Sequence, residues 1–346
     1  MLKISENNMT RLDKSGNRRL IWADSLKGFL ILLVVLGHSI QYTLGNACYF
    51  NHLWNIIYSF HMPAFMAISG FLAYRGGGGI LSIRPTIWRR FRQLMIPFFL
   101  WTLLLMLIGG NVSLKLFLRL FLYPDKGLWF LWSLFFITLL FQLSKWVATK
   151  LNLKHAVVVL CVGVFLAISM VLFKTNLFAI QFIAYYYIYY SLAYYFHKYY
   201  NIIVTENKLV VFLLIVAWIL MAWFWNMHYA PEFLKLLPLP DSIVNYMYRF
   251  VTALIAIYTL MIVAPKILDN TKEWNVLIMK IGQISLGIYS IHFMFLSKIV
   301  PWIKEIGIND NFTILLSFGI TTLCAWGLIT LLSKWKLTSQ FFLGKI

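Results

Sequence analysis

Residues 22–39, WADSLKGFLILLVVLGHS, have the length and apolar content of a helix that crosses a bilayer. They also include Asp24, Lys27 and His38, whose side chains are costly to place in hydrocarbon. Because a helix turns by about 100° and rises by about 1.5 Å per residue, Lys27 and His38 lie about 20° apart around the axis and about 16 Å apart along it. Asp24 precedes Lys27 by three residues, a spacing that allows an ion pair. The three side chains therefore form one polar stripe on a membrane helix.

The composition of the whole chain agrees with this first helix. Of its 346 residues, 61% are hydrophobic and 12% are charged, and a soluble protein of this length could not bury so much apolar surface. The net charge of +19 falls in short runs between apolar spans, which indicates loop bias and contact with anionic lipid. No basic groove interleaved with aromatic residues supports binding to nucleic acid. The three cysteines are scattered, so neither a disulfide framework nor a metal site is expected.

Hydropathy predicts an all-α polytopic bundle of about ten transmembrane helices. The predicted spans are 20–43, 53–73, 92–110, 128–147, 156–173, 175–196, 208–227, 246–265, 279–297 and 312–333. An even number places both termini on one side, and most Lys and Arg residues lie on that side, so both termini are expected to be cytoplasmic.

The same pattern predicts one large domain between two short ends. We expect a cytoplasmic segment at 1–19, a single transmembrane domain at 20–333 and a cytoplasmic tail at 334–346. The first span lacks a small-residue cleavage site, so it is interpreted as a retained helix rather than a signal peptide.

The polar stripe is suited to an elongated anionic ligand that enters from the cytoplasm. Coenzyme A has phosphates at one end and a thioester at the other, so Lys27 would meet its charged or polar portion and His38 its reactive tip. Two simpler readings remain open. Asp24 and Lys27 can extend to the membrane interface, and a membrane histidine such as His38 often only makes a hydrogen bond between helices.

Several further stretches occur in the order and spacing of a known family. They are FHMPAFMAISGF at 60–71, RRFRQLMIPFF at 89–99, GLWFLWSLFF at 127–136 and SLGIYSIHF at 285–293. With Lys27, ten intervening residues and His38, the chain resembles the membrane-bound acyltransferase-3 family over nearly its whole length. The resemblance implies a multi-pass enzyme of the bacterial inner membrane that transfers an acyl group, usually acetyl, from cytoplasmic acyl-CoA to a hydroxyl of an extracytoplasmic carbohydrate.

The resemblance also assigns roles to residues of this chain. His38 matches the catalytic histidine, and Arg89 and Arg92 match an Arg-x-x-Arg pattern that is associated with the donor. Ordinary contact with lipid headgroups is the alternative for the arginine cluster. Lys27 occupies the position where many relatives have Arg. A guanidinium group that can make two parallel hydrogen bonds is thereby replaced by a compact ammonium charge.

The resemblance leaves several properties of the enzyme open. We expect no attached extracytoplasmic esterase-like domain, which many members of the family carry, so a separate partner is one way to complete transfer. Acetyl-CoA is the expected donor substrate, and no metal is expected. The acceptor glycan, the acyl group and the oligomeric state stay open.

Four more polar residues are candidates for supporting roles. His61 and Ser69 in the second span could assist His38, although small residues such as Ser69 often only allow close helix packing. Arg249 and His292 are candidates for binding the acceptor. The alternatives are extension of Arg249 to the membrane interface and a packing role for His292.

Two chemistries fit His38, which can act as a general base or as a nucleophile that briefly carries the acyl group. Asp24 lies about 21 Å away along the helix, so an orienting partner is expected from another helix, for example through His61 or Ser69. A transporter or flippase for a lipid-linked sugar is the alternative function. It would be expected to have broken helices in matching halves and acidic residues at midplane, and the sequence has neither feature. A purely structural scaffold would leave the stripe unexplained.

Overall fold

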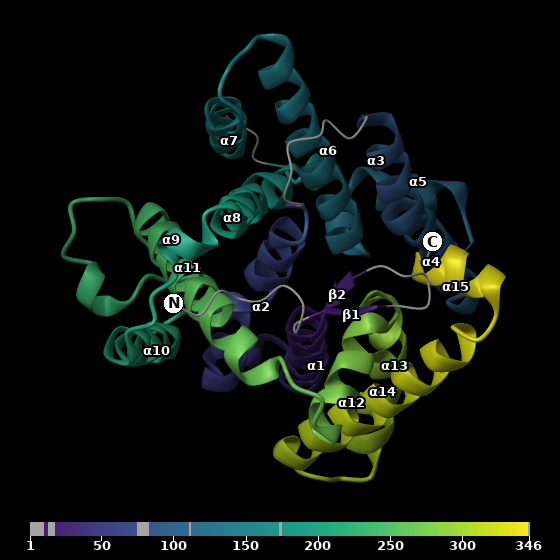
Figure 1. Ribbon diagram of the computed structural model, residues 1–346. Coiled ribbons are helices and arrows are strands. Elements are labelled where there is room, and N and C mark those ends of the chain that lie inside the picture. The colour runs from purple at the N-terminus through teal and green to yellow at the C-terminus, as the bar shows by residue number, and fades with distance from the viewer. Residues whose placement is uncertain (1–9, 13–17, 75–82, 111, 173–174, 345–346) are drawn as a thin grey trace. The chain divides into compact units, whose positions relative to one another are not determined.

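The computed structural model describes residues 10–12, 18–74, 83–110, 112–172 and 175–344, and nearly all of them are helical (Figure 1). One antiparallel hairpin, of β1 (Thr10–Leu12) and β2 (Arg18–Leu20), precedes the first helix. The all-helical prediction is therefore confirmed except for this hairpin. The rest of the predicted segment 1–19 lies outside the described residues.

The chain forms two compact units, which are described separately. The first comprises residues 1–65 and 200–329, and the second comprises residues 66–199 and 330–346. The helices that lie in or begin in the first unit are α1 (Ile21–Leu44), η1 (Gly45–Phe50), α2 (His52–Phe71), α9 (Tyr200–Ile203), α10 (Lys208–Trp223), η5 (Glu232–Leu234), α11 (Asp241–Leu268), α12 (Glu273–Gln283), α13 (Ser285–Glu305) and α14 (Asp310–Leu332).

The second unit contains the end of α2 and the central helices of the chain. These are α3 (Ile83–Arg90), the π-helical turn η2 (Phe91–Met95), α4 (Ile96–Ile108), α5 (Leu114–Leu122), η3 (Pro124–Lys126), α6 (Trp129–Lys150), α7 (His155–Leu172), η4 (Leu177–Ala179), α8 (Ile180–Lys198) and the C-terminal α15 (Lys336–Leu343). Helix α15 lies in the predicted tail 334–346.

Among the described residues, six helical segments are long and apolar enough to cross a membrane. They are Ile21–Phe50, Ile83–Ile108, Trp129–Lys150, Asp241–Leu268, Ser285–Glu305 and Asp310–Leu332. Two shorter apolar helices occupy His155–Met170 and Lys208–Trp223. Helices α2 and α8 overlap the other two predicted spans, 53–73 and 175–196. The membrane character is clear, while the count of ten spans stays a prediction.

The predicted span 279–297 is wrong in its boundaries. Helix α12 ends at Gln283 and α13 begins at Ser285, with Ile284 between them in a non-helical conformation (φ −116°, ψ 12°). The helix that follows continues to Glu305, eight residues past the predicted end. Hydropathy alone could not place this break, because the apolar run continues through it.

Large apolar side chains remain exposed on the outer helices. In α7, Leu160 is 67% exposed and Phe165 is 69% exposed. An apolar face of this kind would be unfavourable in water, whereas lipid tails solvate it well. The exposed residues thus agree with the membrane assignment made from hydropathy.

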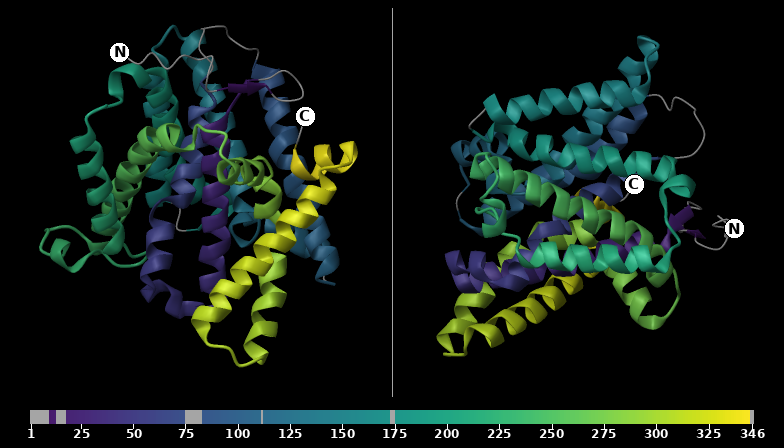
Figure 2. Two further views of the ribbon diagram at one scale, coloured as in Figure 1. Left: turned by 60° about the horizontal axis from the view of Figure 1, so that its bottom comes forward. Right: turned by 90° about the vertical axis from the view of Figure 1, so that its left-hand side faces the viewer.

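Helix α1 packs closely against α12 and α13 within the first unit (Figure 1). Its contact with α12 depends on two glycines. A Cβ atom on Gly28 would lie 2.0 Å from the carbonyl oxygen of Ile278, and one on Gly282 would lie 1.8 Å from that of Asp24. Small residues that let helix backbones approach are the usual packing device in membranes. Helices α13 and α14 are joined by a short loop and form a helical hairpin (Figure 2).

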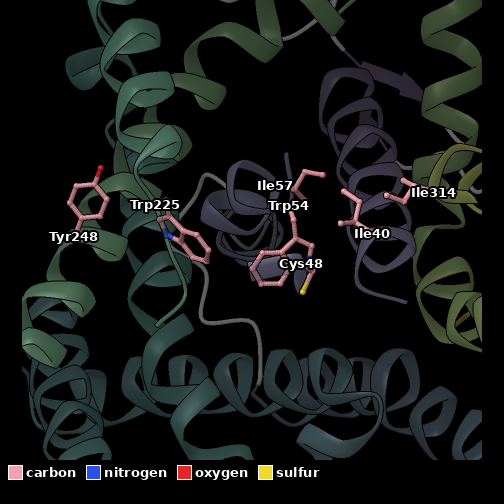
Figure 3. Close-up of a cluster of buried hydrophobic side chains, with 7 residues drawn as sticks. All are labelled: Ile40, Cys48, Trp54, Ile57, Trp225, Tyr248 and Ile314. Atoms are coloured by element: carbon pink, nitrogen blue, oxygen red, sulfur yellow. The ribbon is translucent and has the colours of Figure 1, made fainter. Parts of the chain in front are cut away.

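A buried cluster lies at the end of α1 that is opposite to Lys27. Its seven members come from α1, η1, α2, the segment after α10, α11 and α14 (Figure 3). The rings of Trp54 and Trp225 lie 6.4 Å apart between centroids and are tilted by 55°. The members are Ile40, Cys48, Trp54, Ile57, Trp225, Tyr248 and Ile314. This cluster fixes the start of α2 beside the second half of α1, where His38 lies.

Candidate functional site

His38 lies partly buried in α1 and contacts two polar side chains. Its Nδ1 atom is 3.1 Å from Gln41 Oε1 and 3.3 Å from the Tyr58 hydroxyl of α2. Tyr58 donates in turn to Gln41 Oε1 at 3.1 Å. Gly37 makes room for this arrangement, because a Cβ atom there would lie 2.9 Å from Tyr58 Cε2. Gly37 thus leaves space for the Tyr58 ring, whose hydroxyl contacts His38.

This network fixes which nitrogen of His38 is available for chemistry. Gln41 Oε1 accepts the Tyr58 proton and, as a carbonyl oxygen, can only accept from His38. His38 Nδ1 therefore carries a proton, and Nε2 keeps its lone pair. A lone pair on Nε2 is what either a general base or a nucleophile requires.

Two further histidines lie around His38. The His292 ring of α13 is 5.2 Å from the His38 ring between centroids, and Phe293 is 4.4 Å away. His61 contacts the network through Tyr58, since its ring lies 4.8 Å from that of Tyr58. The structure thus brings together three predicted site residues from α1, α2 and α13.

Both flanking histidines have one nitrogen held by the backbone. His292 Nδ1 lies 2.7 Å from the Tyr289 carbonyl oxygen, and His61 Nδ1 lies 2.7 Å from that of Ile57. A carbonyl oxygen only accepts, so each Nδ1 is protonated and each Nε2 is an acceptor. Both side chains are nearly inaccessible, at 0% exposed for His292 and 3% for His61.

The predicted pair at the other end of the stripe is confirmed. Lys27 Nζ lies 3.2 Å from Asp24 Oδ1, and the Asp24 side chain is the more deeply buried of the two. Because both Lys27 and His38 belong to the continuous helix α1, the expected separation of about 16 Å along the axis holds. Lys27 keeps part of its surface exposed and so remains accessible to an anionic group.

The other predicted donor residues belong to the second unit. Arg89 lies partly buried in the last turn of α3, and Arg92 is exposed in the π-helical turn that follows. Ser69 also lies in that unit, eight residues after His61 on α2 and therefore about 12 Å farther along the axis. Their roles towards the donor and His38 stay predictions.

Arg249 is held by groups of the first unit. Its Nη1 atom donates to the carbonyl oxygen of Met227 at 3.2 Å, and its guanidinium carbon lies 5.4 Å from the ring of Trp225. A second ring, that of Tyr246, lies 5.6 Å away. Arginine stacks well on aromatic faces, so these contacts place a cation beside the buried cluster.

Sequence reasoning missed the two residues that orient His38. The expectation that a partner must come from another helix is wrong for Gln41, which follows His38 by three residues on the same helix face. That spacing could have been noticed. Tyr58 does come from another helix, but it lies in an apolar and aromatic stretch without a distinguishing signal.

Among the described residues, no group of three or more His, Cys, Asp or Glu side chains is placed to hold a metal ion. The groups that His38 can reach are an amide, a phenol and other imidazoles. Proton transfer and nucleophilic attack are therefore the chemistry that its surroundings support directly.

Comparison with known proteins identifies the family. Nodulation protein NolL of Sinorhizobium fredii (strain NBRC 101917 / NGR234) is 37% identical over 155 residues, which cover 38% of this chain and 40% of that protein. NolL of Mesorhizobium japonicum (strain LMG 29417 / CECT 9101 / MAFF 303099) is 31% identical over 158 residues, which cover 38% of this chain and 39% of the relative. The matched region thus spans about two fifths of the length of these curated relatives.

No solved structure matches the chain. A family model described as an acyltransferase domain matches residues 20–331, which include the helices that supply His38, His61 and His292. Because this match covers most of the sequence, the chain belongs to the acyltransferase-3 family.

Proposed function

We propose that the protein is a membrane O-acyltransferase that moves an acyl group, most simply acetyl, from cytoplasmic acyl-CoA to a hydroxyl of an extracytoplasmic carbohydrate. The observation that carries the proposal is the arrangement around His38 Nδ1, which Gln41 and Tyr58 hold so that Nε2 keeps its lone pair. Membership of the acyltransferase-3 family supports the reaction class.

The donor enters from the side of Lys27 in this proposal. The topology that we propose, with ten spans and both termini in the cytoplasm, puts Lys27 near the inner face and His38 deeper in the membrane. The distance between them, about 16 Å along α1, suits a ligand with a charged end and a remote thioester. Arg89 and Arg92 bind the phosphates, for which guanidinium groups have the appropriate geometry.

One route uses His38 as a general base. Its Nε2 atom takes the proton of the acceptor hydroxyl while the hydroxyl oxygen attacks the thioester carbon. The new C–O bond replaces the C–S bond, and the protonated imidazole returns the proton to the departing thiolate. Gln41 stabilises the imidazolium that forms in between, because its Oε1 atom accepts from Nδ1.

The other route uses His38 as a nucleophile. Nε2 attacks the thioester carbon, so a C–N bond forms as the C–S bond breaks and the thiolate leaves. The acceptor hydroxyl then attacks the acyl-imidazole, a C–O bond replaces the C–N bond, and the hydroxyl proton neutralises the thiolate. In both routes His292 Nε2 accepts a hydrogen bond from a second hydroxyl of the acceptor.

The test is His38→Ala in purified protein in proteoliposomes, with labelled acetyl-CoA. We expect acetyl transfer to a panel of p-nitrophenyl glycosides to be abolished, because both proposed routes depend on the Nε2 lone pair of His38. His52→Ala is the matched control, since His52 is exposed at the start of α2 and stacks on Trp223. Normal acetylation by the His38 variant would contradict the proposal.

The same assay separates the two routes. A labelled histidine, trapped by rapid acid quenching without acceptor, would support the nucleophilic route. Release of CoA only when an acceptor is present, without labelled protein, would support general-base catalysis.

A further inference from the structure

The segment after α10 is held between the start of α2 and α11. Asn226 Nδ2 donates to the carbonyl oxygen of Tyr49 at 3.0 Å, and Asn55 Nδ2 donates to the same oxygen at 3.1 Å. From the other side, Asn245 Nδ2 of α11 donates to the carbonyl oxygen of Met227 at 3.3 Å. These bonds, all within the first unit, surround Trp225 with ordered polar side chains.

Several polar atoms in this region are buried and unpartnered within the described residues, Trp54 Nε1 among them. Three of these atoms belong to the side chains considered next, and they are Asn55 Oδ1, Asn245 Oδ1 and Trp225 Nε1. Their side chains are only 5%, 5% and 3% exposed. Most buried polar atoms in proteins have a hydrogen-bond partner, so these exceptions within one region call for an explanation. Two are acceptors and one is a donor, a mixture that an alcohol group can satisfy in both directions.

The region is continuous with the His38 network. Trp54 stacks on Tyr58 with 3.8 Å between ring centroids, and its ring lies 6.4 Å from that of Trp225. Tyr58 in turn contacts His38. A ligand that occupies the Trp225 region would therefore lie on the side of His38 that is remote from Lys27.

We propose that Asn55, Asn245 and Trp225 form a subsite for a hydroxyl-bearing sugar ring of the acceptor. The two amide oxygens accept from sugar hydroxyls, and the indole N–H donates to a hydroxyl oxygen. The aromatic faces contact the apolar C–H surface of the ring, and Arg249 holds the indole in place through its contact with the ring. This inference rests on the proposed function, since it names the binding site of the acceptor in that reaction.

The experiment measures binding and transfer separately. Trp225→Phe keeps an aromatic ring but removes the N–H, and Asn245→Leu replaces the amide by an apolar group of similar size. Calorimetry with methyl glycosides in the His38→Ala background measures binding without turnover. We expect each change to weaken glycoside binding at least fivefold and, in otherwise unchanged enzyme, to raise the KM for the p-nitrophenyl glycoside. The KM for acetyl-CoA should stay within twofold.

Trp223→Phe is the matched control, because Trp223 is exposed and lies only two residues away. Thermal unfolding reports on folding, and if Asn245→Leu does not fold, Trp225→Phe decides alone. Unchanged glycoside binding and KM in a folded Trp225→Phe variant would overturn the subsite while leaving the acyltransferase function in place. Failure of the unmodified protein to release CoA from acetyl-CoA with any glycoside would instead contradict the proposed function.

Discussion

The hydrogen bonds to His38 allow a quantitative test of how it is oriented. Tyr58→Phe removes a hydroxyl and leaves the ring to stack on Trp54, while Gln41→Leu removes the shared acceptor oxygen. A hydrogen bond of this kind contributes about 1 kcal/mol, so each variant should lower kcat about fivefold. The KM for acetyl-CoA should not change, because neither side chain is assigned to the donor.

The double variant tests whether the two side chains act together. Independent effects would multiply to roughly 25-fold, but both bonds end on Gln41 Oε1, so we expect only about tenfold. Initial rates of CoA release with a p-nitrophenyl glycoside measure this cycle. Tyr42→Phe is the control, since Tyr42 follows Gln41 on α1 and its side chain is exposed. A folded Tyr58→Phe variant with the kcat of the unmodified enzyme would refute the orienting role.

Two further predictions concern α1. Gly28→Ala should destabilise the protein by roughly 1–3 kcal/mol, because the added Cβ atom would clash with the Ile278 carbonyl oxygen. Gly319→Ala is the control and should not destabilise the protein, since no described atom lies within 4 Å of a Cβ atom at that position. Thermal unfolding in detergent measures both, and equal midpoints would contradict the packing argument. Lys27→Met should raise the KM for acetyl-CoA about tenfold with little change in kcat. Lys27→Arg should restore the KM of the unmodified enzyme, because the positive charge is needed rather than the shape of the ammonium group. An unchanged KM in Lys27→Met would remove Lys27 from the donor site.

The local features of the site followed from the sequence. Helical periodicity is a property of the backbone, so the shared face of Lys27 and His38 and the Asp24–Lys27 pair could be predicted from spacing alone. Composition likewise determined that the chain is a helical membrane protein. Motifs at 60–71 and 285–293 led to His61 and His292, although spacing did not show how near they lie to His38.

Contacts between helices required the tertiary structure. Tyr58 reaches His38 because Gly37 leaves room for its ring, and His292 reaches it because α13 begins after a break that hydropathy does not register. The buried polar atoms of Trp225 and Asn245 are also invisible in sequence, since any asparagine or indole in a loop or helix would look the same. Side-chain periodicity sets which face a residue occupies, but only the packing of distant helices decides which other residues meet it there.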